Sequence, residues 1–173
     1  MWKWKGDNRI KAVCFDLGDT LIAEETVVHD SSGRAITAHL IEGVFEVLEA
    51  IRKEGYRIGI IANGDSTGCW NIIEATGLKD YFDAIVISEE VGIEKPDKKI
   101  FEIALARLGV KPERAVMVGN RIDTDILGAN RFGMKSVWFR WNTRYSDIID
   151  RSQEKPDFTI NSFFELPGLL ALM

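Results

Sequence analysis

The sequence is short of several residue types, and each shortage excludes a class of protein. It has only two cysteines in 173 residues, Cys14 and Cys69, and they form no CxxC pair. We therefore expect two reduced thiols, not a disulfide framework or a zinc site. No apolar run approaches the roughly 20 residues of a membrane-spanning helix. The charged N-terminus lacks the apolar stretch of a signal peptide, so we expect a cytoplasmic protein without membrane contact.

Positive charge is also scarce. Lysine and arginine number 22 against 27 aspartates and glutamates, which gives a formal net charge of −5 at pH 7. A nucleic-acid binder needs a basic face for the phosphate backbone, so no nucleic-acid partner is expected. The length suits one domain, and no linker or internal repeat interrupts the chain. The sequence therefore predicts a single domain over residues 1–173.

Short apolar runs alternate with helical spacing of apolar residues along the chain. Helices are predicted around residues 44–51, 100–108 and 126–131, each followed by a glycine that can end it. Strand, helix and strand in this order are typical of an α/β fold with a doubly wound parallel sheet. The runs that predict strands are 12–15, 58–61, 84–87, 115–118, 136–139 and 158–160.

The segment from 22 to 40 does not follow this rhythm. It holds clusters of charged and turn-forming residues and no sustained period, so we expect a long loop or a short β-flap. Trp2 and Trp4 also stand out, because two tryptophans in a charged lead-in are candidates for packing against a neighbouring subunit.

Polar residues follow four of the predicted strands. They are Asp16 to Thr20, Asn63 to Asp65, Glu94 to Asp97, and Asn120 to Asp125. Parallel strands end at one edge of their sheet, so these groups should meet there. Gathered carboxylates repel one another, and a hard cation such as Mg²⁺ relieves that repulsion. A nearby lysine would offset the charge of a nucleophile and of an anionic substrate.

These four motifs, in this order, resemble those of the haloacid dehalogenase superfamily over nearly the whole chain from Lys11 to about Phe139. The resemblance implies a Rossmann-like fold of three layers, α/β/α. It also implies a Mg²⁺-dependent phosphatase that forms an aspartyl-phosphate from a small or exposed phosphomonoester. Larger members insert a cap domain that this spacing cannot hold, so the chain resembles the capless subclass. An open site of that kind motivates a homo-oligomer that completes it.

The resemblance also assigns roles to individual residues. Asp16 matches the nucleophile, Lys95 the lysine of the third motif, and Asp19 is a displaced candidate for proton transfer. A helix starting near Ser66 would offer free backbone amides to a phosphate. The expected metal ligands are Asp16, the backbone carbonyl of Gly18, Asn120 and Asp125. The expected contacts to substrate or phosphate are Thr20, Asn63, Gly64 and Arg121.

Three positions depart from the family pattern. Gly18 stands where many of its phosphatases have an aspartate as general acid and base, Ala62 replaces a serine or threonine, and Asn120 replaces an acid. Loss of a positioned general acid typically lowers a rate by about 10²–10⁴. Two alternatives to a phosphatase therefore stay open. One is a weakened family member that serves as a binding or regulatory module, and the other is a haloacid dehalogenase.

Overall fold

The computed structural model describes residues 9–149 and 152–173, so Trp2 and Trp4 lie outside the described residues. Among the described residues, six strands form one parallel sheet in the order β5-β4-β1-β6-β7-β8, and two more form an antiparallel hairpin. This confirms the predicted α/β fold with its doubly wound sheet. The sheet strands are β1 (Ala12–Phe15), β4 (Arg57–Ala62), β5 (Ala84–Ile87), β6 (Ala115–Gly119), β7 (Lys135–Phe139) and β8 (Phe158–Ile160); the hairpin strands are β2 (Ile22–His29) and β3 (Ala35–Leu40).

Helices connect the strands of the sheet. No helix within the described part of the chain has the length and the apolar character needed to cross a bilayer. The helices are α1 (Val44–Lys53), α2 (Ser66–Ala75), α3 (Ser88–Val91), α4 (Lys98–Leu108), α5 (Leu127–Phe132) and α6 (Leu166–Leu170). Shorter 3-10 turns are η1 (Lys79–Tyr81), η2 (Pro112–Arg114), η4 (Ser152–Glu154) and η5 (Phe163–Glu165), and η3 (Ile122–Ile126) is a π-helical turn.

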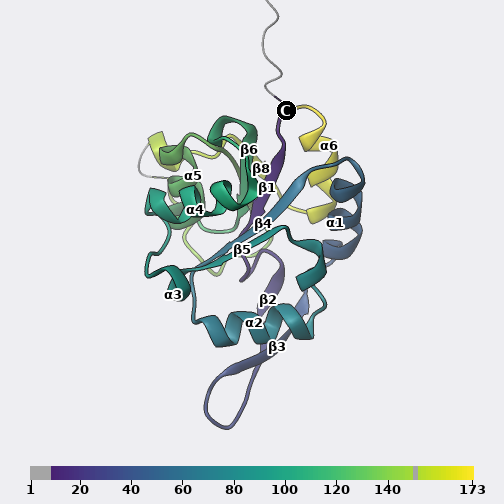
Figure 1. The fold of residues 1–173 in the computed structure, drawn as a ribbon, viewed down its shortest axis with the longest axis vertical. Helices are drawn as coiled ribbons and strands as arrows, with labels where there is room; N and C mark the ends of the chain where they lie inside the picture. The colour runs from purple at the N-terminus through teal and green to yellow at the C-terminus, as the bar shows by residue number, and fades with distance from the viewer. Residues whose placement is uncertain (1–8, 150–151) are drawn as a thin grey trace, which may run out of the picture.

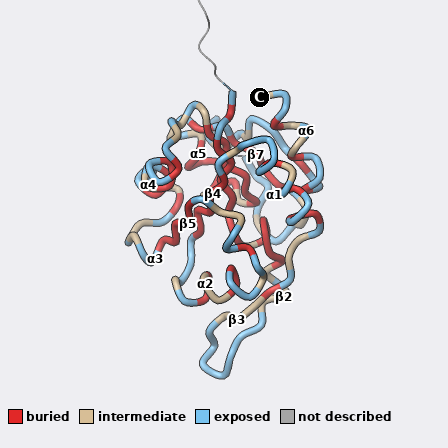
Figure 2. Tube along the Cα trace, turned by 45° about the vertical axis from the view of Figure 1, so that its right-hand side comes forward, coloured by how far each residue is buried: buried red, intermediate tan, exposed pale blue. Residues whose placement is uncertain are grey.

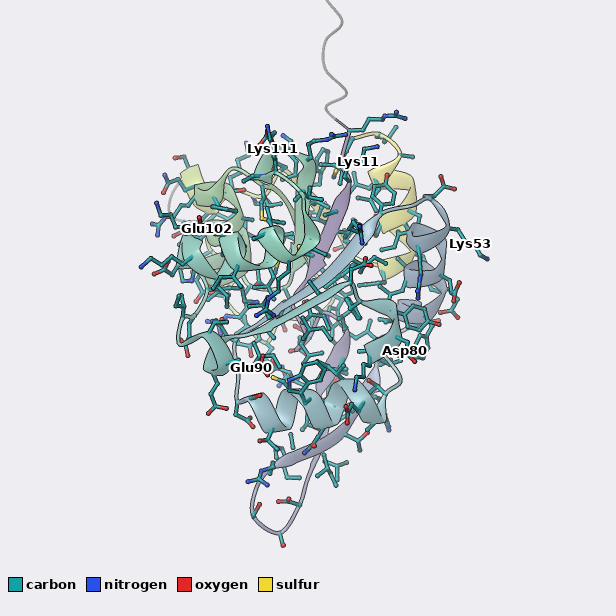
Figure 3. The ribbon with its side chains drawn as sticks, in the orientation of Figure 1. Lys11, Lys53, Asp80, Glu90, Glu102 and Lys111 are labelled. Carbon is teal, nitrogen blue, oxygen red and sulfur yellow. The ribbon has the colours of Figure 1, made fainter. Side chains whose placement is uncertain are left out.

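Alternate residues of each strand face opposite layers of helices, as the pleat of a strand requires. Val13 and Phe15 of β1 belong to the core that α1 and α6 cover. Ala12 and Cys14 belong to the core that α4 and α5 cover on the other face. Figure 1 shows the two helical layers on either side of the sheet, and Figure 2 shows buried backbone concentrated in the central strands. The charged side chains labelled in Figure 3 lie on the outside of these layers.

The irregular segment forms the β2–β3 hairpin, which confirms the expected flap. The hairpin lies beyond the carboxyl ends of the sheet strands, next to α2 (Figure 1). The Asn71 side-chain amide of α2 donates to the Ala35 carbonyl of β3 at 2.9 Å, which joins the flap to the core. Within the described residues, only this hairpin and α1 separate β1 from β4, and no helical cap domain is inserted there.

Helix α1 shows why the apolar pattern predicts its structure. Val44, Val47, Leu48 and Ile51 form the buried stripe that the spacing predicts. Acidic Glu46 lies in the first turn, and basic residues lie in the last, where each stabilises the helix dipole. The helix therefore depends on burial of one face against the sheet.

We expect Leu48→Ala to lower the free energy of unfolding by about 2–5 kcal/mol, because it leaves a cavity beneath α1. Leu48 is fully buried, whereas Glu46 in the same helix is exposed. The matched control Glu46→Ala should change the free energy by less than about 0.5 kcal/mol. Urea unfolding followed by circular dichroism measures both, and equal effects would contradict the assignment of this core.

Candidate active site at the carboxyl ends of the strands

The Lys95 ammonium lies at the centre of the expected cluster. Its Nζ is 2.7 Å from Asp16 Oδ1 and 2.8 Å from Asp125 Oδ1, and it donates to the Ile61 carbonyl at 2.6 Å. These partners follow or end β1, β6 and β4, so the strand ends converge as the topology predicts. All three donors of the ammonium have acceptors, as a buried lysine requires. Burial tends to lower the pKa of Lys95, but the paired carboxylates of Asp125 and Asp16 outweigh it, and the pKa is raised.

Asn63 holds the backbone of Lys95 in place. Its side-chain oxygen accepts from the Lys95 N–H at 2.8 Å, and its amide nitrogen donates to the Lys95 carbonyl at 3.0 Å. Both ends of the amide are therefore used within the protein. Asn63 lines the pocket beside Asp16, but the structure gives it the role of positioning the lysine instead of the expected contact to phosphate.

The π-helical turn η3 buries Asp125 completely. A side chain at Gly119 would place its Cβ within 2.5 Å of the Asp125 carboxylate, so only glycine at position 119 leaves room for it. The Arg121 backbone N–H donates to Asp125 Oδ2 at 3.0 Å. Burial raises the pKa of Asp125 to about 6, against the lowering effect of Lys95, and the Asp16 charge raises it further. A second positive charge near Asp125 would favour its ionised form.

Asp16 lines a pocket of about 270 Å³ between the strand ends, the hairpin and α2. Lys95 binds its Oδ1, and none of the described residues hydrogen-bonds to its Oδ2. Cys69 lines the same pocket, but burial and the nearby charges of Asp65 and Asp16 raise the pKa of its thiol to about 12. The thiol therefore stays protonated, and Asp16 is the better placed nucleophile.

The backbone N–H of Gly64, an expected phosphate contact, already has a partner within the protein. The Gly64 N–H donates to Ser88 Oγ at 3.0 Å. At the start of α2, the Ser66 N–H donates to Glu89 at 2.7 Å, and the Gly68 N–H donates to the N-cap residue Asp65 at 2.6 Å. These amides are satisfied within the protein, and the carboxylates around them would repel a phosphate.

Asp19 and Thr20 also differ from their expected roles. Asp19 adopts a left-handed φ of 49° and is fully buried. Its carboxylate binds Arg144 Nε and the Glu24 backbone N–H, so it anchors neighbouring segments and does not line the pocket. The buried Thr20 hydroxyl donates to Asn120 Oδ1 at 3.4 Å. Thr20 therefore positions Asn120, and a direct contact with phosphate is not supported.

Mg²⁺ requires oxygen ligands, which the side chains and carbonyls at this edge of the sheet can supply. No group of three or more His, Cys, Asp or Glu side chains in the described ranges could hold a metal by itself. Asp16 and Asp125 would therefore need the Gly18 carbonyl, Asn120 and water, which suits the hydrated coordination of Mg²⁺. The buried Asn120 amide nitrogen has no hydrogen-bond partner. Turning this amide by 180° would let it donate to Thr20 and leave its oxygen for a cation. The donors fit.

The rim of the pocket joins one expected residue, Arg121, to Tyr145, which the motifs did not reveal. Arg121 lies at the rim as expected, forms two hydrogen bonds with Asp123, and stacks over the Tyr145 ring at 4.7 Å. Tyr145 in turn donates to Glu24 Oε2 at 2.8 Å. Neither Tyr145 nor Arg144 lies in a motif, and no sequence signal connects them to residues more than 100 positions earlier.

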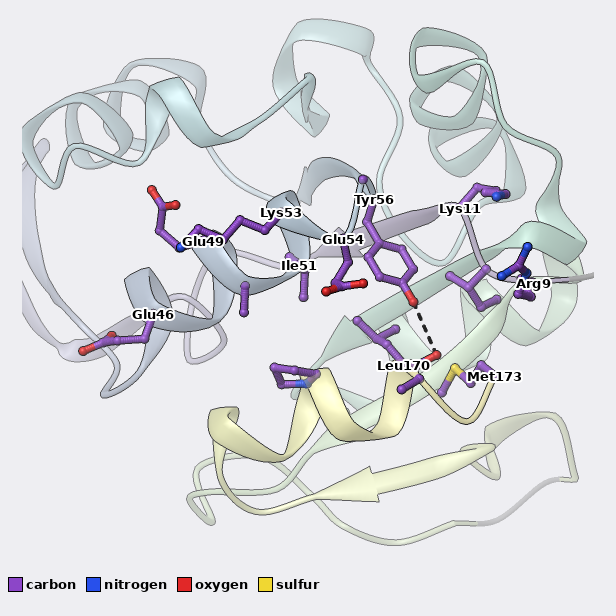
Figure 4. Close-up of a pocket in the computed structure, with 15 residues that line it drawn as sticks. Arg9, Lys11, Glu46, Glu49, Ile51, Lys53, Glu54, Tyr56, Leu170 and Met173 are labelled. Carbon is purple, nitrogen blue, oxygen red and sulfur yellow. Dashed lines mark hydrogen bonds between the residues drawn. The ribbon is translucent and has the colours of Figure 1, made fainter.

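A larger hollow than the pocket at Asp16 lies elsewhere. It has a volume of about 730 Å³ and lies between α1, α6 and the start of β1. Figure 4 shows its charged and apolar lining, with the Tyr56 hydroxyl donating to the Leu170 carbonyl. It contains none of the residues of the strand-end cluster, and parallel sheets bind ligands beyond the carboxyl ends of their strands. The smaller pocket at Asp16 is therefore the candidate site.

Comparison with known families agrees with this geometry. A model of the family described as "Haloacid dehalogenase-like hydrolase" matches residues 22–139. This chain belongs to the haloacid dehalogenase-like hydrolase family. The match includes Lys95, Asn120 and Asp125 but begins after Asp16, so the placement of Asp16 depends on the geometry above.

Relatives within the family carry phosphatase names. The glyceraldehyde 3-phosphate phosphatase of Pyrococcus furiosus is 40% identical over 133 residues, which are 77% of this chain and 54% of that protein. The protein of the same name from Methanocaldococcus jannaschii is 31% identical over 164 residues, 95% of this chain and 70% of that protein. This chain spans about half the length of several curated relatives that it matches. A solved HAD phosphatase from Thermococcus onnurineus aligns with a TM-score of 0.79 and 26% identity, covering 93% of this chain and 98% of that chain.

We expect Lys95→Met to lower the free energy of unfolding by about 3–5 kcal/mol, because it leaves two buried carboxylates without their counter-charge. Adding Asp125→Asn should recover part of this loss, since one of the two unpaired charges is then gone. Lys53→Met is the matched control at an exposed lysine (Figure 3) and should have little effect. Urea unfolding without Mg²⁺ tests this, and equal losses for the two lysine variants would contradict it.

Proposed function

We propose that this chain is a Mg²⁺-dependent phosphatase that transfers the phosphoryl group of a small phosphomonoester to Asp16. The observation that carries the proposal is Lys95 bound between Asp16 and Asp125 at the base of a pocket, with one Asp16 oxygen left without a protein partner. The names of the relatives support it, since they include phosphatases of glyceraldehyde 3-phosphate and of N-acylneuraminate 9-phosphate, and a pyrimidine 5′-nucleotidase.

Each residue of the site has its own role in the proposed reaction. Asp16 attacks phosphorus and forms an aspartyl-phosphate, which water then hydrolyses, so that one difficult displacement becomes two easier ones. Lys95 fixes the rotamer of Asp16 and reduces the repulsion between that carboxylate and the anionic substrate. Asn63 holds Lys95 through its backbone. Asn120 and Asp125, together with Asp16 and the Gly18 carbonyl, would hold the metal ion, which supplies positive charge to the phosphoryl oxygens when bound.

The pocket favours a small substrate. Its volume of about 270 Å³ is at the low end for ligand sites. The hairpin and α2 contribute an apolar wall that includes Ile22, Val27 and Ile72. This wall suits the carbon chain of a phosphorylated sugar or a similar metabolite, whereas the phosphate would lie beside Asp16. A cytoplasmic location, the single domain and a homo-oligomer that completes the site stay predictions.

Asp16→Asn should abolish Mg²⁺-dependent hydrolysis of 4-nitrophenyl phosphate, with a loss of about 10³-fold or more, because the amide cannot act as the nucleophile. Asp80→Asn is the matched control, since Asp80 is exposed (Figure 3) and does not line the pocket at Asp16. Release of nitrophenol measured at 405 nm gives both rates. Wild-type activity in the Asp16→Asn variant would contradict the mechanism.

Removal of Mg²⁺ by EDTA should abolish the same activity, and Mg²⁺ alone should bind the protein with measurable heat. We expect Asp125→Asn to weaken that binding about tenfold or more, because a charged ligand becomes neutral. Asp123→Asn is the control, because its carboxylate is exposed and bound to Arg121. Isothermal titration of the two variants with Mg²⁺ checks the assignment, and equal affinities would refute it.

Gly18 keeps a second function open. A haloacid dehalogenase uses the same aspartate and needs no acid at that position. If the protein releases chloride from 2-chloropropionate without metal and releases no phosphate from phosphomonoesters, it is a dehalogenase and not a phosphatase. Binding of beryllium fluoride without turnover of any phosphomonoester would instead identify a binding module.

A further inference from the structure

Gly18 lies where the resemblance places an aspartate, yet its side-chain space is occupied. A Cβ built on Gly18 would lie 2.2 Å from Glu24 Oε1 and 3.1 Å from the Glu24 Cγ and Cδ atoms. Gly18 is not among the glycines with positive φ, so its backbone does not require glycine. The carboxylate of Glu24, from the first strand of the flap, occupies the space that a side chain at position 18 would take.

We propose that Glu24 is a catalytic residue that replaces the missing aspartate as proton donor and acceptor. The inference rests on the phosphatase function proposed above. Glu24 lines the same pocket as Asp16 and Lys95. Its oxygen Oε1 occupies the space into which a side chain at position 18 would project, two residues after the nucleophile.

The protein holds Glu24 in this place from two sides. The Glu24 backbone N–H donates to Asp19 Oδ1 at 3.0 Å, and Oε2 accepts from the Tyr145 hydroxyl at 2.8 Å. Oε1 has no hydrogen-bond partner in the described part of the chain. The side chain is 35% exposed, so it is accessible from the pocket, while its neighbours restrict its rotation. Tyr145 therefore holds Oε2, and Oε1 is available to bind and release a proton.

The two chemical steps then balance. As Asp16 forms a bond to phosphorus and the ester P–O bond breaks, protonated Glu24 gives its proton to the departing alkoxide oxygen. The alcohol leaves, and Glu24 is a carboxylate. This carboxylate then takes a proton from water as the water oxygen attacks phosphorus and the bond between phosphorus and Asp16 breaks. Inorganic phosphate leaves, and both Asp16 and Glu24 return to their starting states.

A different role for Glu24 must be distinguished from this one. Its bond to Tyr145, and the position of Arg144 Nε 3.8 Å from Oε2, make Glu24 a link between the flap and the segment after β7. A purely structural link would affect every substrate alike. A proton donor matters most for a poor leaving group, because a stable leaving anion such as nitrophenolate needs little protonation.

The test compares Glu24→Gln with wild type on 4-nitrophenyl phosphate and on glycerol 3-phosphate. Glutamine keeps the size of the side chain and an oxygen that accepts from Tyr145. We expect kcat/KM for glycerol 3-phosphate to fall by about 10²–10⁴, the usual value of a positioned acid, whereas kcat/KM for the aryl ester changes little. For both substrates kcat should fall, because hydrolysis of the aspartyl-phosphate needs the base; nitrophenol should then appear in a burst.

The outcomes separate this inference from the proposed function. If the wild-type protein hydrolyses neither ester, both the proposed phosphatase function and the role of Glu24 are contradicted. If the wild-type protein hydrolyses both esters and Glu24→Gln lowers kcat/KM equally for the two, the phosphatase function is supported. The role of Glu24 as a proton donor is then contradicted. Activity on the aryl ester alone also overturns it, since an acid at the site exists to expel alkoxides. Glu25→Gln is the matched control, because Glu25 binds Arg144 and does not line the pocket.

A second pair of variants moves the carboxylate back to position 18. Gly18→Asp alone should displace the Glu24 carboxylate, because its Cβ would lie 2.2 Å from Glu24 Oε1. In Gly18→Asp/Glu24→Ala this close contact is gone, and an acid again lies two residues after Asp16. We expect at least a tenfold higher ratio of alkyl to aryl kcat/KM than in Glu24→Ala. A double variant that retains the wild-type circular dichroism but shows no recovery would contradict the replacement.

Discussion

One ammonium group holds the ends of three strands together. Lys95 Nζ bonds to the carboxylate after β1, to a carbonyl of β4 and to the carboxylate after β6. These strands are neighbours in the sheet, and each brings oxygen atoms that would repel those of the others. A lysine buried alone would tend to lose its proton, whereas here the two carboxylates keep it charged. The geometry of the site therefore depends on this ion cluster.

The cluster can be this compact because glycine stands where carboxylates approach the backbone. Gly119 leaves space for Asp125, and Gly18 leaves space for Glu24. At both positions a Cβ would meet a carboxylate oxygen at 2.2 Å, so in each case the carboxylate would have to move to admit a side chain. The two glycines differ in origin, since Asp125 follows in the same motif and Glu24 comes from the flap. The departure at Gly18 is thus matched by a carboxylate and is not an empty position.

The sequence predicts the sheet and the convergence of its polar ends because both follow from local pattern. Apolar runs define the strands, and parallel topology brings Asp16, Lys95 and Asp125 to one edge. The roles of single side chains depend instead on distant partners. Gly64 gives its N–H to Ser88, 24 residues later, and Asp19 binds Arg144, 125 residues later. Glu24 meets Tyr145 across 121 residues. No spacing rule connects such pairs, so these roles could not be derived before the chain was folded.

Placing the proton donor on the flap has a physical consequence, since the described residues between β1 and β4 hold only the hairpin and α1. The base of the hairpin is fixed, because Asp19 binds the Glu24 N–H and Tyr145 binds its carboxylate. The far end of the hairpin is exposed, including the apolar side chains of Val28 and Ile36. The strand that carries Glu24 therefore runs from this fixed base to the exposed end of the flap. The fixed base of the hairpin therefore holds Glu24 in the pocket that Asp16 also lines, whatever the exposed far end contacts.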